Sequence, residues 1–311
     1  METAEPDRRL ADLIAEDGAL FARGTLVAVL DGARIDDLPH RLLAAGVEAE
    51  PLYGEATQPA LIEVGPQAVR VREGELDALL ALSGRRRGAV WWWWEEEGDA
   101  AWSRALSHLR SLETMELPTQ RHDNLDAAPN APFERVLFRH ADPDAFRQLW
   151  TVLHPAQRAR LAGGAAAVLL DAPSYFGAER IEPEAGVLAP SGPLRIATPA
   201  QYAALSTAAD EAMRLRCVEG VRACMPEQAA ALGAARVDAL VREGMASAES
   251  LGFAHDDTTF RWCCLNVACE GAVIGMAGLE AQFAAAEESP DALADAIYDE
   301  VMRAADPAGG G

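Results

Sequence analysis

One stretch decides the fold: Thr25-Leu26-Val27-Ala28-Val29-Leu30-Asp31-Gly32-Ala33-Arg34, a short apolar run that ends in a turn. A similar pattern returns later as Val136-Leu137-Phe138-Arg139-His140-Ala141-Asp142-Pro143. We interpret both as buried strands that lead into the starts of helices, because short apolar runs bounded by turn residues are typical of strands.

Strand and helix signals alternate around these two stretches. Further strand-like runs are expected at 60–64, 89–94, 113–117 and 165–170, and residues 133–138 extend the second stretch. Between them, helices are predicted after Asp36-Asp37, over 76–82, from Gly98, from the capping pair Asp142-Pro143 and from Pro155. This alternation predicts an α/β fold, an N-terminal sheet with flanking helices.

The run Trp91-Trp92-Trp93-Trp94 stands in one of these strands. Successive side chains of a strand point to opposite faces, so Trp91 and Trp93 should cover one face of the sheet and Trp92 and Trp94 the other. A strand that is apolar on both faces lies inside a sheet with helices above and below it. We therefore expect most of the four to serve the core, with one or two near the strand end able to reach a groove.

The second half of the chain is predicted to be helical. A Pro- and Gly-rich stretch precedes Thr198-Pro199-Ala200-Gln201, which has the form of a capping box, and helical spacing continues to about residue 305. We divide the chain into an N-terminal extension (1–24), an α/β domain (25–171), a linker (172–197), a C-terminal helical lobe (198–305) and a flexible tail (306–311). A mostly polar segment, 118–130, is predicted to be a loop.

The composition excludes several classes of partner. The formal net charge is −22, and every basic side chain other than histidine is arginine, because the chain has no lysine. This balance disfavours nucleic acid and anionic membranes. From Met245 onward there are twelve Asp or Glu against two Arg, which indicates either a solvated face or attraction of a basic partner. The N-terminus lacks a secretory signal, and no apolar run is long enough to span a bilayer, so we expect a cytoplasmic protein.

Catalytic motifs are scarce. The chain has no P-loop, no Gly-x-Ser-x-Gly and no His-Glu-x-x-His, and none of its five cysteines forms a Cys-x-x-Cys. We expect no cofactor and no metal, and we expect the cysteines to fill helix interfaces rather than to bind zinc or to form disulfides.

One enzymatic alternative stays open. Asp31, His140 and Asp142 could form an acid/base set at the ends of neighbouring strands, in a small-molecule hydrolase or transferase. Local roles explain the same residue types: Asp31 in a turn with Gly32, Asp142 as a helix cap, Arg139 paired with a carboxylate, and His140 as an incidental strand-end residue. We favour these local roles.

The order of several short motifs resembles a known family. The motifs are 30–34, Pro51-Leu52-Tyr53-Gly54, the strand 88–94, and Phe138–Pro143 running into Leu153-His154-Pro155-Ala156-Gln157. Their order and spacing, over about residues 25–171, are similar to those of the effector-adaptor chaperones of the bacterial type VI secretion system. Val241-Arg242-Glu243-Gly244, followed by a helix break at Leu251-Gly252, resembles the helical C-terminal part of these chaperones.

The resemblance implies a cytoplasmic, non-catalytic adaptor that holds an effector protein and helps to load it onto the valine-glycine-repeat spike protein. On this hypothesis the effector contacts a groove between the two lobes, through Arg34, Arg139, Tyr175 and Phe176, since arginine and aromatic residues are frequent binding hot spots. Tyr175 and Phe176 could equally pin the linker onto the core. A structural subunit of the secretion machine is a third possibility.

Overall fold

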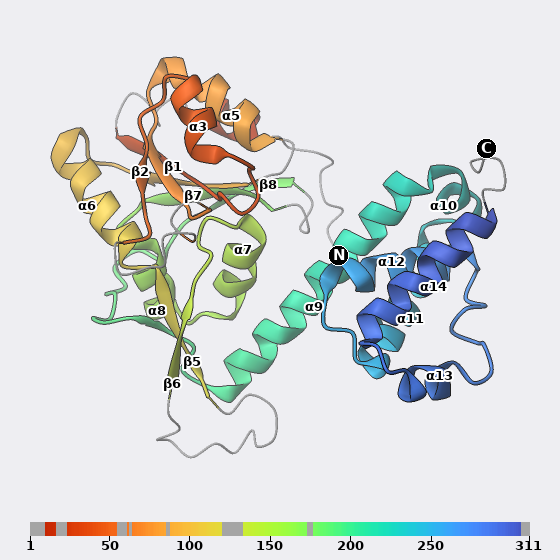
Figure 1. Ribbon diagram of the computed structural model, residues 1–311. Coiled ribbons are helices and arrows are strands. Elements are labelled where there is room, and N and C mark those ends of the chain that lie inside the picture. The colour runs from red at the N-terminus through yellow and green to blue at the C-terminus, as the bar shows by residue number, and fades with distance from the viewer. Residues whose placement is uncertain are drawn as a thin grey trace. The chain divides into compact units, whose positions relative to one another are not determined.

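The computed structural model describes residues 10–16, 24–54, 61, 64–84, 88–119, 133–172 and 177–305. The chain forms two compact units, Met1–Ala209 and Asp210–Gly311 (Figure 1). The first holds the strands, and the second consists of helices. The predicted class, an N-terminal sheet with flanking helices plus a C-terminal helical lobe, is therefore confirmed.

A six-stranded sheet forms the centre of the first unit, in the order β2-β3-β1-β4-β7-β8. Every pairing in it is antiparallel. The predicted strands at its centre are confirmed as β1 (Thr25–Leu30), β4 (Ala89–Trp94) and β7 (Ala167–Ala172). The others are β2 (Glu50–Pro51), β3 (Gln67–Arg70) and β8 (Gly177–Ile181).

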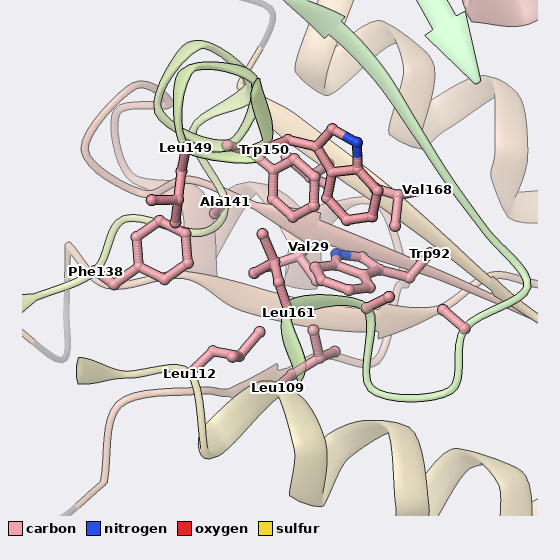
Figure 2. Close-up of a cluster of buried hydrophobic side chains, with 14 of the residues drawn as sticks. Val29, Trp92, Leu109, Leu112, Phe138, Ala141, Leu149, Trp150, Leu161 and Val168 are labelled. Carbon is pink, nitrogen blue, oxygen red and sulfur yellow. The ribbon is translucent and has the colours of Figure 1, made fainter. Parts of the chain in front are cut away.

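The tryptophans of β4 are divided between the two faces of this sheet, as predicted. Trp92 and Trp94 belong to one hydrophobic core, while Trp91 belongs to a second core on the other face, against which the half-buried Trp93 packs. Trp92 has no exposed surface and contacts Phe146 edge to face, with ring centroids 5.4 Å apart. Figure 2 shows its indole within the first core, near Val29.

Helices cover both faces of the sheet. On the Trp91 side, the core includes residues of α1 (Leu10–Glu16), α3 (Leu38–Ala44) and α5 (Leu76–Gly84). On the Trp92 side, it includes residues of α6 (Gly98–Arg110), α7 (Pro143–Val152) and α8 (Pro155–Ala162). A 3-10 turn, η1 (Glu73–Glu75), precedes α5. The double layer buries a strand that is apolar on both faces, as the sequence requires.

A small second sheet extends the first unit. Its order is β6-β5-β9, with β5 (Thr114–Pro118) antiparallel to β6 (Phe133–Leu137) and parallel to β9 (Leu194–Arg195). The Val136 stretch thus lies in a different sheet from β1, and β6 is not buried: its residues are half-buried or exposed. The expectation of two buried neighbouring strands was wrong, because β6 pairs with β5 alone among the described strands.

The second unit is built from helices around two hydrophobic clusters. α9 (Pro199–Cys224) begins in the first unit and ends in the second, where it is followed by five helices. They are α10 (Pro226–Leu232), α11 (Ala234–Leu251), α12 (Asp256–Ala268), α13 (Leu279–Ala285) and α14 (Pro290–Ala305). The predicted cap of α9 forms in part: Thr198 Oγ1 accepts a hydrogen bond from the Gln201 amide at 3.1 Å, but the Gln201 side chain accepts one from Ala197 instead.

Three predicted boundaries require correction. The strand expected at 60–64 lies later, at β3, since Leu61 is helical and Val64 lies in a turn. The segment 172–197 is more than a linker, because β8 and β9 pair within the two sheets, and the division between units falls after Ala209. The extension 1–24 contributes α1, whose Leu10, Leu13 and Ile14 are buried. The loop predicted at 118–130 and the tail at 306–311 lie largely outside the described residues.

The packing of Trp92 leads to a prediction. Replacing it by alanine should lower the free energy of unfolding by about 3–5 kcal/mol, because the substitution leaves a large cavity in the first core. The control is Leu188→Ala, at a side chain that is 89% exposed, which should change stability by less than about 0.5 kcal/mol. Urea unfolding of both variants measures the difference, and equal stabilities would contradict this account of the core.

Candidate functional site

Asp31 directly follows β1 and organises the turn there. Its Oδ1 accepts a hydrogen bond from the Ala33 amide at 3.0 Å, and its carbonyl accepts from the amides of Arg34 and Ile35. Gly32 is required beside it, because a Cβ there would lie 2.7 Å from the Gly65 carbonyl oxygen and 2.8 Å from that of Val64. The predicted Asp31-Gly32 turn is confirmed, and it fixes the Arg34 backbone at the strand end.

Asp142 caps α7, as predicted. Its Oδ1 accepts hydrogen bonds from the amides of Asp144 at 3.0 Å and Ala145 at 3.4 Å, and Pro143 occupies the first helical turn. Such a cap satisfies amides that have no partner inside the helix. Asp142 and Asp144 are thereby held at the helix N-terminus, where negative charge is favourable.

Two arginines join the turn after β1 to the start of α7. The Arg34 guanidinium lies 2.9 Å from Asp142 Oδ1 and 3.2 Å from Asp144 Oδ2. The Arg139 guanidinium lies 2.6 Å from Asp31 Oδ2 and 3.4 Å from Asp142 Oδ2. We call these five residues the strand-end cluster. Since they come from segments more than 100 residues apart, the cluster ties the end of the large sheet to α7.

The carboxylates of the strand-end cluster are buried, whereas its arginines reach the surface. The side chains of Asp31, Asp142 and Asp144 are 5%, 8% and 3% exposed, against 48% for Arg139 and 21% for Arg34. Buried carboxylates need cationic partners, so each guanidinium is held in one position. The result is a preorganised arginine at the surface.

The electrostatics agree with this geometry. Burial alone would lower the pKa of Arg139, but the carboxylates of Asp31 and Asp142 outweigh it and raise that pKa above its ordinary value. Burial raises the pKa of Tyr53, which lies near the cluster, and the negative charge of Asp31 adds to this effect. Arg139 is therefore charged and Tyr53 neutral at physiological pH.

His140 does not join the carboxylates. It is fully buried, its Nδ1 lies 3.2 Å from the Phe138 carbonyl oxygen, and its Nε2 has no hydrogen-bond partner among the described residues. Burial lowers its pKa to about 4, and the nearby His108, which is half-buried and whose own pKa is lowered to about 4, contributes. Neither ring nitrogen is hydrogen-bonded to Asp31 or Asp142, so the acid/base set imagined from the sequence is not assembled in this conformation.

Two segments that adjoin the cluster each carry an exposed apolar side chain. Val64, whose carbonyl oxygen closely approaches Gly32, is 49% exposed, and Leu137, two residues before Arg139, is 45% exposed. They are two of the five large hydrophobic side chains that are exposed in the described part of the chain. Sequence reasoning missed both, because neither stands out from the apolar runs around it.

The structure brings two of the four predicted partner-binding residues together. Arg34 and Arg139, proposed as partner contacts, lie together in the strand-end cluster. Tyr175 and Phe176 lie outside the described residues. Of the cysteines, Cys217, Cys263 and Cys264 are buried, Cys269 is half-buried and Cys224 is exposed.

Neither a metal site nor a membrane-spanning helix is present in the part of the chain that the structure describes. The described residues contain no group of three or more His, Cys, Asp or Glu side chains arranged to hold a metal ion. None of their helices combines the length and the apolar content that a bilayer crossing requires.

Comparison with known proteins gave one result. Residues 26–160 match a family model described as Domain of unknown function (DUF4123). The match runs from β1 into α8 and contains the whole strand-end cluster. No curated protein and no solved structure matches the chain.

The burial of the carboxylates predicts the effect of removing Arg139. Arg139→Met should destabilise the protein by about 1–2 kcal/mol, less than for a fully buried pair because Arg139 is half-exposed. The control is Arg135→Met, which removes a 65% exposed arginine that lies 3.8 Å from Glu116; because Glu116 keeps its second partner, Arg195, the change should cost less than about 0.5 kcal/mol. Urea unfolding measures the free energy of unfolding of both variants. Equal losses would show that the strand-end cluster stabilises the fold no more than a surface ion pair does.

The buried histidine predicts a pH dependence. Because the folded pKa of His140, about 4, lies below its ordinary value of 6.5, the unfolded chain takes up a proton first, and stability falls as the pH drops from about 7 toward 4. His140→Gln should remove about 1–2 kcal/mol of the stability difference between pH 7 and pH 5. The control, Leu188→Gln, changes an exposed side chain that carries no titratable group and should leave that difference unchanged. Urea titrations at both pH values test this, and an identical pH dependence in the His140 variant would refute it.

Proposed function

We propose that the protein is a cytoplasmic, non-catalytic adaptor that binds an effector of the type VI secretion system and assists its loading onto the valine-glycine-repeat spike protein. The observation that carries the proposal is the strand-end cluster, where buried carboxylates hold Arg139 and the adjoining segments carry the exposed Val64 and Leu137. The order of motifs over residues 25–171, which resembles that of these adaptors, supplies the biological setting.

This surface has the chemistry of a protein-binding site. Hot spots in protein interfaces are enriched in arginine, and a side chain that is already fixed loses little conformational entropy on binding. Exposed apolar side chains beside it add area that a partner can bury. A guanidinium of this kind binds a carboxylate or backbone carbonyl oxygens of another polypeptide.

The enzymatic alternative lacks a comparable observation. Asp31 and Asp142 are engaged by Arg139, and Asp142 is also committed to the cap of α7. His140, the intended proton-transfer group, lies in the core with its pKa lowered to about 4. We therefore give the carboxylates and the histidine structural roles, and we assign the binding function to Arg139 with Val64 and Leu137.

Co-expression with the products of neighbouring genes tests the proposal. The tagged full-length protein should co-purify one of them and keep it soluble. A triple variant, Val64→Ser with Leu137→Ser and Arg139→Lys, should reduce the recovered partner by about tenfold or more, since it removes apolar area and the planar guanidinium but keeps the charge that the carboxylates need.

The matched control carries the same types of change elsewhere in the first unit: Leu43→Ser, Leu188→Ser and Arg72→Lys, all at exposed side chains. It should recover the partner as the parent does. Absence of any co-purified neighbour, or equal recovery with the triple variant, would refute the proposed function or its placement at this surface. Circular dichroism of both variants excludes misfolding as the cause.

A further inference from the structure

The helical unit carries a groove of its own, far along the sequence from the strand-end cluster. It has a volume of about 660 Å³ and is lined by α11, α13 and the turns that precede α13. Its apolar lining includes the half-buried Leu251 and Ile274 and the buried Leu279. Met276 stands at the groove with 57% of its surface exposed, the most exposed large hydrophobic side chain of this unit among the described residues.

Met276 lies in the loop that connects α12 to α13, not in a helix or a strand. Residues 269–278 form successive turns between α12 and α13, and Gly278, with φ of 86°, turns the chain into α13. Methionine is unbranched and polarizable, and proteins use it at surfaces that adapt to apolar side chains of different shapes. An exposed methionine next to Leu251 and Ile274 therefore offers an adjustable apolar contact.

Negative charge borders this apolar lining. Glu243 of α11 and Glu280 of α13 both line the groove and are exposed. Glu243 pairs with Arg236 at 3.5 Å, whereas Glu280 makes no ion pair with any described residue. The region 210–305 holds 17 Asp or Glu against 7 Arg. Five of those arginines already pair with carboxylates of the same unit.

We propose that this groove binds an amphipathic helical segment of a partner polypeptide, with one apolar face and with lysine or arginine along its flanks. The apolar face would lie on Leu251, Ile274 and Met276, and the basic flanks would meet Glu243 and Glu280. Helices that dock by an apolar face into a hydrophobic groove are a recurrent mode of recognition, and complementary charge sets their orientation and speeds association. The proposal rests on the adaptor function and adds the chemistry of a second contact.

The groove lies outside the part of the chain that matches the family model, residues 26–160. Contacts here therefore use residues that the matched segment does not contain. The strand-end cluster, by contrast, lies wholly within that segment.

A defined peptide pair tests the proposal on the full-length protein. The probe is a fluorescent Leu/Lys peptide of about 18 residues, about five helical turns, whose leucines fall on one face. Its scrambled isomer has the same composition and charge without an apolar face. Fluorescence anisotropy at physiological salt should show the amphipathic peptide binding at least tenfold more tightly than the isomer. Equal binding of the two would mean charge attraction alone and would overturn the proposal, as would no binding of either.

Substitutions in the groove locate the contact. Met276→Ser with Glu280→Gln should weaken binding of the amphipathic peptide about tenfold, since both an apolar contact and a charge are removed. The matched control, Leu188→Ser with Glu287→Gln, likewise replaces one large apolar side chain by serine and one glutamate by glutamine, at exposed positions that do not line the groove, and should bind within twofold of the parent. Equal weakening by both would overturn the assignment to this groove.

The two proposals fail separately. About tenfold weaker peptide binding in the Met276/Glu280 variant, together with about tenfold lower effector recovery in the strand-end triple variant, supports both. If the groove substitutions leave peptide binding unchanged while effector recovery still depends on Arg139, Val64 and Leu137, the proposed groove contact is refuted and the adaptor function is not.

Discussion

The burial of β4 on both faces is the constraint on which the first unit depends. Four consecutive tryptophans in a strand direct large apolar surfaces to both sides of the sheet, and Trp91 and Trp92 are completely buried. One layer of helices could cover only one of them. The chain therefore needs two cores, one with α1, α3 and α5 and one with α6, α7, α8 and residues of the small sheet. α1 packs on the sheet for the same reason, since it helps to cover the Trp91 face.

Much of the fold could be predicted from local signals. The strands at β1, β4 and β7, the cap at Asp142 and the ends of α8 and α14 each carry their own pattern, a short apolar run or capping chemistry, within a few residues. Local sequence patterns failed to predict the strands that form only because they pair with another strand. β3 contains Gln67 and Arg70 and becomes a strand through β1, while β8 and β9 are short and polar and are defined by their partners. Which sheet receives β6 is likewise a tertiary property.

The candidate site, too, could be predicted only where its structure depends on neighbouring residues. Turn and cap chemistry predicted why Asp31 and Asp142 are acidic, and it predicted that Arg139 pairs with a carboxylate. It could not show that Arg34 crosses to Asp142 and Asp144 while Arg139 crosses to Asp31, because both pairs join segments more than 100 residues apart. Nor could it place His140 in the core, since a histidine at a strand end has the same sequence environment whether it faces solvent or packs against Phe138.

The position of β7 has a consequence for the limits of the folded unit. β7 pairs with β4 along Ala167–Leu170, whereas the family match ends at residue 160. A fragment cut at that residue would leave the tryptophan strand with an open edge, and such edges recruit other chains into aggregates. The matched segment is thus shorter than the stretch that holds every strand of the two sheets, which reaches through β8 and β9.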